Sequence, residues 1–142
     1  GPMTPELMFS LSGTVALVGW LSLAAGILLR NALLRDTMAG LAIPLALSTA
    51  YAVLILVFWW TAEGGFDSLA NVQKLFTSPW VALAGWIHYL AFDLAIGALL
   101  ARKIMAAGLS RLFLIPILPL TFLFGPIGFL LGQAVLLSRK EA

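Results

Sequence analysis

The stretch WVALAGWIHYLAFDLAIGALL, from Trp80 to Leu100, decides the fold of this chain. It is apolar enough to be a membrane span, because a helix needs roughly 20 residues to cross a hydrocarbon layer of about 30 Å. It also contains the only histidine of the chain, His88, and an aspartate, Asp93. At a rise of about 1.5 Å per residue, Asp93 lies roughly 20 Å into the span, where an unpaired carboxylate is costly. We therefore expect its carboxyl group to face a bundle interior or a polar cavity.

The composition of the whole chain also indicates a membrane protein. Of the 142 residues, 62% are hydrophobic and 10% are charged, and the mean hydropathy is +1.06. No soluble domain of this length buries so much apolar surface. The net charge of +2 gives no reason to expect nucleic acid as a partner, and the absence of cysteine excludes disulfides, thiolate metal sites and cysteine nucleophiles.

The hydropathy pattern predicts four spans, at about 7–29, 38–60, 80–100 and 112–137. Because lipid cannot satisfy free backbone groups and the alternation of a barrel strand is missing, we expect these spans to be helices. The expected fold is all-α: a polytopic, four-transmembrane-helix bundle forming one domain over residues 3–142. Residues 1–2 resemble the remnant of a cleaved expression tag.

The last predicted span contains Pro116, Pro119 and Pro126. Each proline removes one backbone hydrogen bond and frees the carbonyl four residues earlier. Those carbonyls need protein or water partners in lipid. We therefore expect this helix to be bent and packed against the others, with the Thr121 hydroxyl in the bend.

The linker between the second and third predicted spans is longer than the other two. Asp67 or Ser68 could cap a short helix there, and Leu69, Val72 and Phe76 would then share one apolar stripe. We expect an amphipathic helix lying on the membrane surface. An ordinary loop is the alternative.

Basic residues near span ends predict the orientation. The two short linkers carry five of them: Arg30, Arg35, Arg102, Lys103 and Arg111. The opposite side of a four-span protein would carry three: Lys74, Arg139 and Lys140. This bias predicts that both termini lie outside, in what we expect to be a bacterial inner (cytoplasmic) membrane.

His88 and Asp93 are the strongest candidates for chemistry, because ionisable residues within spans are usually functional. Asp93 could instead join helices through hydrogen bonds alone. His88 lies about 140° round the helix from Asp93, so a pocket or a bulge would have to bring the two together. A lone histidine could also bond a neighbouring carbonyl or a haem iron. One histidine is too few for a membrane di-iron hydroxylase.

Three segments match motifs of one membrane-protein family: GGFDS at Gly64–Ser68, GWIHYLAFDL at Gly85–Leu94 and TFLFGPIG at Thr121–Gly128. On these segments the chain resembles the abscisic-acid-deficient-type family, and its bacterial branch most closely. Plant members are required for neoxanthin synthesis in plastids. The resemblance implies a cofactor-independent isomerisation of a carotenoid 5,6-epoxide to an allenic alcohol, as from violaxanthin to neoxanthin. Family members often have an arginine five positions after the aspartate; here that residue is Ala98, with Arg102 as a candidate substitute.

This implied chemistry suggests roles for individual residues. Opening an epoxide requires an acid at its oxygen, and forming an allene requires a base at a neighbouring C–H bond. Our hypothesis makes Asp93, kept protonated, the acid and His88 the base, although the roles could be swapped. The residues expected to bind a flat polyene and its polar end are Trp86, Tyr89, Phe92, Thr121, Phe122, Phe124, Pro126 and Arg102. The aromatic members of this set are equally ordinary as core packing.

Two other classes of function stay open. The first is a non-catalytic membrane subunit that binds a carotenoid or another isoprenoid lipid, which the missing arginine favours. The second is a small proton-coupled transporter that works as a homo-oligomer and uses Asp93, although the sequence shows no inverted repeat. The expected partners are the lipid bilayer and a hydrophobic carotenoid-like ligand. No cofactor and no metal ion are expected.

Overall fold

The computed structural model describes residues 3–141, so the expected tag remnant Gly1–Pro2 lies outside the described residues. The elements in chain order are α1 (Pro5–Leu28), the π-helical η1 (Leu33–Ala42), α2 (Ile43–Phe58), the 3-10 turn η2 (Trp59–Thr61), α3 (Leu69–Leu75), α4 (Pro79–Ala106), the 3-10 turn η3 (Arg111–Phe113), α5 (Leu114–Leu123) and α6 (Gly125–Glu141). The helices Pro5–Leu28, Leu33–Thr61 and Pro79–Ala106 are long and apolar enough to cross a membrane. The all-α prediction is confirmed, and these three helices coincide with the first three predicted spans.

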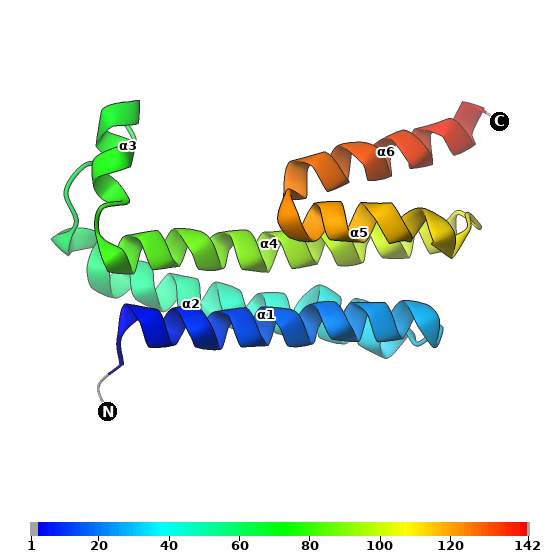
Figure 1. Cartoon of the computed structure of the whole chain (residues 1–142), viewed down its shortest axis with the longest axis horizontal. Coiled ribbons are helices and arrows are strands. Elements are labelled where there is room, and N and C mark those ends of the chain that lie inside the picture. The colour runs from blue at the N-terminus through cyan, green and yellow to red at the C-terminus, as the bar shows by residue number, and fades with distance from the viewer. Residues whose placement is uncertain (1–2, 142) are drawn as a thin grey trace.

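The predicted fourth span is not one helix. It breaks at Phe124, whose φ of −141° and ψ of 71° lie outside the helical region. Pro126 follows directly and cannot donate a backbone hydrogen bond. The backbone of Ile127 instead donates to the Phe124 carbonyl at 2.8 Å, which starts a new helix. As a result α5 runs toward the middle of α4, and α6 turns back beside it as the second arm of a hairpin (Figure 1).

Glycine allows the two arms of this hairpin to meet. A Cβ atom placed on Gly128 would overlap the Thr121 hydroxyl and would lie 2.5 Å from the Thr121 backbone nitrogen. Only a residue without a side chain fits so close to a neighbouring backbone. The sequence predicted a bend here, whereas in the structure the chain reverses its direction.

The hairpin places the two ends of the chain at opposite ends of the molecule (Figure 1). Pro5 of α1 and Pro79 of α4 line the same cavity, so α1 begins where α4 begins. Arg139 of α6 donates a hydrogen bond to the carbonyl of Ala107, so α6 ends where α4 ends. Both termini would lie on one side only if the last span crossed completely, which the α5–α6 hairpin does not do.

The new path of the chain also changes the charge balance between the two ends. Of the eight lysines and arginines, all except Lys74 belong to the end at which α1, α4 and α6 finish, so the ratio is seven to one instead of five to three. Cytoplasmic ends of membrane proteins carry the excess of basic residues. In this structure the excess of basic residues therefore lies at the end where α6 finishes.

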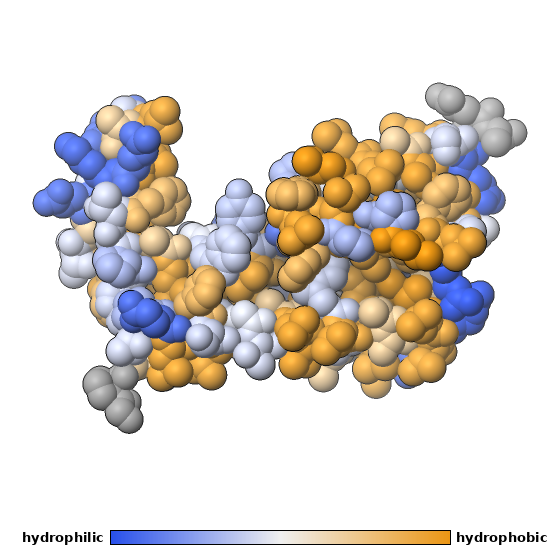
Figure 2. All heavy atoms as spheres, viewed as in Figure 1, coloured by the Kyte–Doolittle hydropathy of each residue, from blue (hydrophilic) through white to orange (hydrophobic). Residues whose placement is uncertain are grey.

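The centre of the structure is α4, which is held by two groups of buried side chains. In its first half, Ile87 packs with Leu54 of α2. In its second half, Leu100 packs with Leu23 of α1 and Ile117 of α5. Because α5 has 10 residues and α4 has 28, the hairpin covers only part of the outer face of α4. Apolar side chains cover the middle of the surface, and hydrophilic residues gather at its two ends (Figure 2).

The predicted surface helix is present as α3. Ser68 caps it, since its hydroxyl oxygen accepts a hydrogen bond from the Asn71 backbone at 3.1 Å. In Figure 1, α3 lies across the direction of α4, which is the orientation of a helix in the plane of a membrane surface. Of its apolar side chains Leu75 is buried and Leu69 is exposed, and Phe76 after the helix lies against Gly85 of α4.

Single cysteines test the hairpin, because the natural chain has none. We expect Ala106→Cys and Ser138→Cys to react with a membrane-impermeant maleimide from the same side, and Gln73→Cys from the other side. Labelling of intact spheroplasts and of inverted vesicles measures this. A Ser138→Cys variant that reacts from the same side as Gln73→Cys would contradict the hairpin and support the four-span bundle.

Candidate functional site

The outer face of α4 is uncovered between α3 and the α5–α6 hairpin. Figure 2 shows a hollow at this place, with α3 on one side and the hairpin on the other. Trp86, Tyr89 and Phe92 of α4 are 46%, 57% and 56% exposed. In a span, such exposed side chains face lipid or a ligand that comes from lipid.

His88 lies at the end of this hollow that is nearer to α3. Its ring is 5.8 Å from the ring of Tyr51 of α2 and 4.7 Å from the ring of Phe92. His88, Tyr51 and Tyr89 line a cavity of about 280 Å³, which Phe76 helps to close. The imidazole makes no hydrogen bond to another residue within 3–141. The cavity therefore offers flat apolar walls, two phenol groups and a free imidazole.

Asp93 lies at the other end of the hollow, where the hairpin begins to cover α4. Its carboxyl group lies directly against Gly125, the first residue of α6; a Cβ atom on Gly125 would overlap Oδ1 and lie 3.1 Å from Cγ. A helix N-terminus carries a partial positive charge of about half an elementary charge. The start of α6 therefore offsets part of the cost of a carboxylate at this depth.

His88 and Asp93 do not meet directly. They are about 7.5 Å apart along the axis of α4 and about 140° apart around it. His88 contacts α2, whereas Asp93 contacts the first residue of α6. The two groups flank the hollow, so a long ligand that lies along α4 would pass both.

The candidate substitute for the missing arginine does not reach Asp93. Arg102 lies nine residues further along α4, which is about 13 Å along the axis and about 180° around it. The position of the missing arginine, Ala98, is buried, and a Cβ atom on Gly40 of η1 would lie 3.3 Å from the Ala98 side chain. An arginine at this position would push η1 and α4 apart. Arg102 therefore lies on the opposite side of α4 from Asp93, and its expected role as a substitute stays a prediction.

The predicted ligand-binding residues of the hairpin lie in different surroundings. Thr121 is fully buried, and its hydroxyl donates to the Ile117 carbonyl at 2.7 Å, so it packs within the hairpin. Phe122 turns toward α1, where its ring lies 5.4 Å from that of Trp20. Phe124 and Pro126 are exposed at the helix break, next to the glycine that contacts Asp93.

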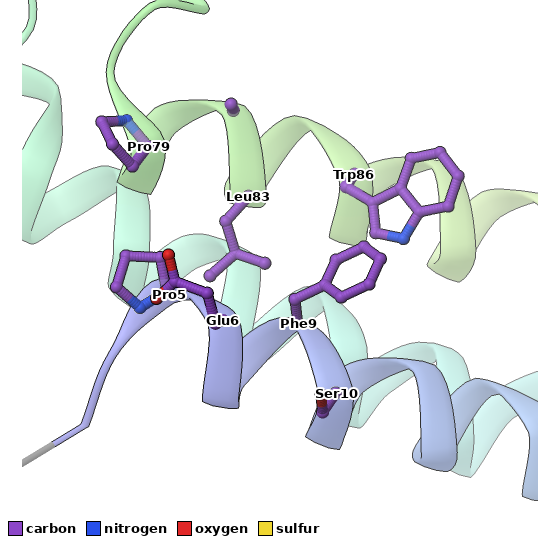
Figure 3. A pocket seen from close by; sticks show the side chains of 8 residues that line it. Pro5, Glu6, Phe9, Ser10, Pro79, Leu83 and Trp86 are labelled. Carbon is purple, nitrogen blue, oxygen red and sulfur yellow. The ribbon is translucent and has the colours of Figure 1, made fainter.

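Trp86 belongs to a different cavity. Its ring lies 6.0 Å from that of Phe9 in α1, and both line a space of about 500 Å³ between the beginnings of α1 and α4, together with Glu6 and Ser10 (Figure 3). Trp86 is still close to the hollow, since its ring is 6.1 Å from that of Tyr89. Its predicted contact with a ligand of the His88 cavity is therefore peripheral.

The sequence analysis did not predict that Tyr51 and the aromatic side chains near α3 belong to the site. Tyr51 is one of two tyrosines in the chain and the only one in its span, which was the available signal. Within residues 3–141, no group of three or more histidine, aspartate or glutamate side chains gathers closely enough to hold a metal ion.

Comparison with known proteins gives one match. The model of the family described as ABA DEFICIENT 4-like matches residues 7–131. No curated protein and no solved structure matches the chain. The matched range contains α1 from Leu7 onward, α2 to α5, the first turns of α6, and both residues that flank the hollow.

The contact between Gly125 and Asp93 predicts a stability effect. We expect Gly125→Ala to lower the free energy of unfolding by about 1–3 kcal/mol, since the new methyl group overlaps the carboxyl group. The loss should shrink when Asp93→Ala is present in the same chain. Tryptophan-fluorescence melting in detergent measures both effects.

A matched glycine serves as the control. A Cβ atom on Gly13 of α1 meets nothing within 4 Å, so Gly13→Ala should stabilise the protein by roughly 0.5–1 kcal/mol. Equal effects of the two alanines would show that Gly125 is not in contact with Asp93.

Proposed function

Because the chain belongs to the ABA DEFICIENT 4-like family, we propose that it is a membrane-embedded isomerase of a carotenoid or related isoprenoid, as in neoxanthin synthesis. The observation that carries this proposal is the hollow on α4, with His88 at one end and Asp93 at the other. The hollow opens to the side of the bundle and not to its ends, so a hydrophobic substrate enters from lipid. Neither group has a hydrogen-bond partner among residues 3–141 that would have to be displaced.

The chemistry of an epoxide-to-allene isomerisation fits two separated groups. One group gives a proton to the epoxide oxygen as the ring opens, and the other takes a proton from a neighbouring carbon. The product has the same atoms and the same oxidation level as the substrate, so no oxidant or reductant enters. Asp93 is the acid and His88 the base. Between them, Phe92 and Tyr89 give the polyene flat surfaces to lie on.

The surroundings of Asp93 suggest how the acidic end of the site works without the family arginine. A partial positive charge from the start of α6 acts on the carboxyl group in place of a full guanidinium charge. This charge is fixed in position because Gly125 lies against the carboxyl group. The hairpin therefore forms one wall of the site and also supplies the partial positive charge that acts on the Asp93 carboxyl group.

A non-catalytic carotenoid-binding subunit is the second candidate. It is favoured by the absence, among residues 3–141, of a hydrogen bond or ion pair between Asp93 and any cationic side chain. Without such a partner the carboxyl group could simply hold a polar end of a ligand.

Turnover of a reconstituted epoxycarotenoid distinguishes these functions. We expect Asp93→Asn and His88→Ala each to lower the rate by roughly 100-fold or more, the usual worth of a general acid or base, while the polyene absorption band of bound ligand persists. Chromatography of the products measures the rate.

The matched control is Glu6→Gln, which removes an ionisable group from the other cavity and should retain full rate. Full activity of both the Asp93 and the His88 variants contradicts the proposed roles. A wild-type protein that binds the pigment and does not convert it supports the carrier instead.

A further inference from the structure

The end of the molecule that carries the basic residues contains a second cavity, far from the α4 hollow. Its volume is about 440 Å³, and it is lined by Arg30, Ser110 and Arg111 together with the backbone turn at Gly108–Leu109. This volume lies within the range of roughly 300–1,000 Å³ that is usual for small-ligand sites. Among the side chains that the structure describes, no acidic one lines the cavity. The cavity is therefore suited to an anion.

An apolar groove continues from this cavity toward the middle of the membrane. It has a volume of about 400 Å³ and lies between α1 and α5, with Ala24, Ile27, Ile115 and Leu118 among its lining residues. Arg111 and Leu112 line both the cavity and the groove. The site thus has a cationic head at the membrane end and an apolar tail along two spanning segments.

Arg111 is held in place by the end of α1. Its Nη1 donates to the carbonyl oxygens of Ile27 and Leu28, at 3.0 and 3.2 Å. Within residues 3–141, its Nε and Nη2 have no hydrogen-bond acceptor. A planar guanidinium group fixed on one side presents its other donors in the geometry that suits a phosphate.

Arg30 has an unusual backbone. Its φ is +51°, and it is the only non-glycine residue with positive φ within residues 3–141. It occupies the position after the C-cap of α1, where glycine is the usual residue; the Asn31 backbone donates to the Gly26 carbonyl at 2.9 Å, which closes the turn. A side chain in this conformation costs roughly 1 kcal/mol or more. An arginine side chain at this position therefore suggests a function that glycine could not perform.

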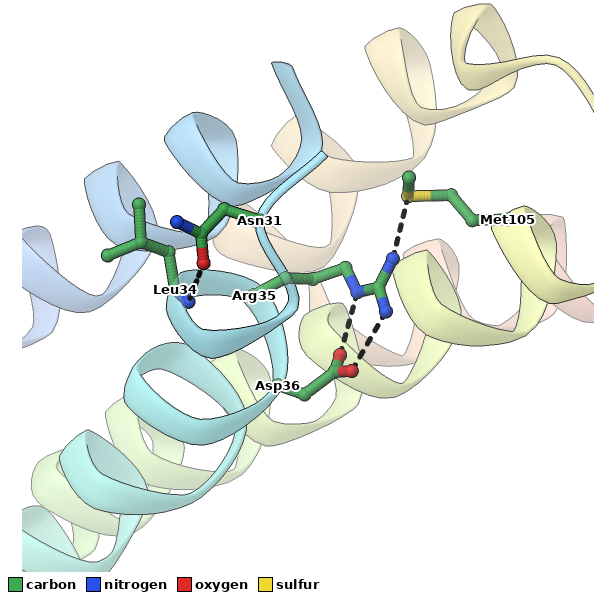
Figure 4. Close-up of polar contacts among 5 residues, drawn as sticks. All are labelled: Asn31, Leu34, Arg35, Asp36 and Met105. Carbon is green, nitrogen blue, oxygen red and sulfur yellow. Dashed lines mark hydrogen bonds and ion pairs between the residues drawn. The ribbon is translucent and has the colours of Figure 1, made fainter. Parts of the chain in front are cut away.

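A further arginine near this end is already neutralised. Arg35 donates from Nε and Nη2 to the two oxygens of Asp36, at 2.7 and 2.8 Å (Figure 4). Its Nη1 contacts the sulfur of Met105, which lines the cavity from the same side. No such ion pair engages Arg30 or Arg111 among residues 3–141. The charged side chains that line the cavity are Arg30 and Arg111.

We propose that this cavity and groove bind one anionic glycerophospholipid, with its phosphate between Arg30 and Arg111 and an acyl chain between α1 and α5. Basic pockets at the cytoplasmic ends of spans commonly hold anionic head groups. A lipid is the occupant because the cationic cavity is continuous with an apolar groove, which a soluble phosphate would leave empty. The bound lipid bridges the turn after α1 to the start of α5. It thereby secures the hairpin at the end where it enters the membrane.

Lipid titration of the purified full chain, followed by native mass spectrometry, tests the proposal. We expect phosphatidylglycerol to bind at least about tenfold more tightly than phosphatidylcholine of the same chain length. Arg30→Gly should remove most of this preference, yet it should also raise the melting temperature of the lipid-free protein, because glycine suits the turn. Loss of binding with gain of stability separates a ligand contact from a structural role. Arg111→Gln should weaken binding as well, but it also removes a contact to α1.

Lys103→Gln is the matched control, since it removes one positive charge from the same end outside the cavity. It should leave the preference for phosphatidylglycerol within about twofold. Equal binding of the two lipids, or equal losses in Arg30→Gly and Lys103→Gln, would overturn the proposal. Competition by millimolar inorganic phosphate would overturn it too, because the site would then recognise a soluble anion.

Discussion

The contact between Asp93 and the first residue of α6 determines how much of α4 is covered. α5 ends at this level because Phe124 leaves the helical conformation and Pro126 cannot continue the hydrogen bonding. Gly125 then lets the chain turn back without displacing the carboxyl group. Had the last segment continued as one straight helix, it would have covered the face that carries Tyr89, four residues before Asp93. The open hollow and the reversed C-terminus are therefore consequences of the same break.

The constraint behind this arrangement is the lack of water in the hydrocarbon layer. Backbone groups and charged side chains at that depth need partners within the protein or a bound ligand. The helix N-terminus that begins at the break lies close to a carboxylate, and its partial charge is of opposite sign. A polar aspartate and an irregular turn, each costly alone, thus compensate for each other. The imidazole of His88 has no such partner among residues 3–141, which is why the hollow around it is the natural place for a ligand.

Much of this fold could be predicted from the sequence, and the failures have physical causes. The first three spans follow from hydropathy, and the α3 helix follows from the cap at Ser68 and the apolar stripe after it. The prolines of the last segment indicated a bend, but a local pattern does not distinguish a bend from a reversal, because the close contact of Gly128 with Thr121 is a tertiary one. The orientation depends on the same reversal, since the side on which Arg139 is counted changes with it. In the site, the position of Asp93 within its span was evident. Its contact with Gly125, the inward burial of Thr121 and the rotation of Arg102 away from it all depend on how the helices pack.

The central claim is that the hollow on α4 holds a long unsaturated lipid between His88 and Asp93. Mass spectrometry of the lipids and pigments retained by gently purified protein, compared between the wild type and Phe76→Ala, tests it most directly. We expect an isoprenoid polyene close to one per chain in the wild type and much less of it when a wall of the His88 cavity is removed. Retention of bulk phospholipid alone, in equal amounts in both proteins, would contradict the account.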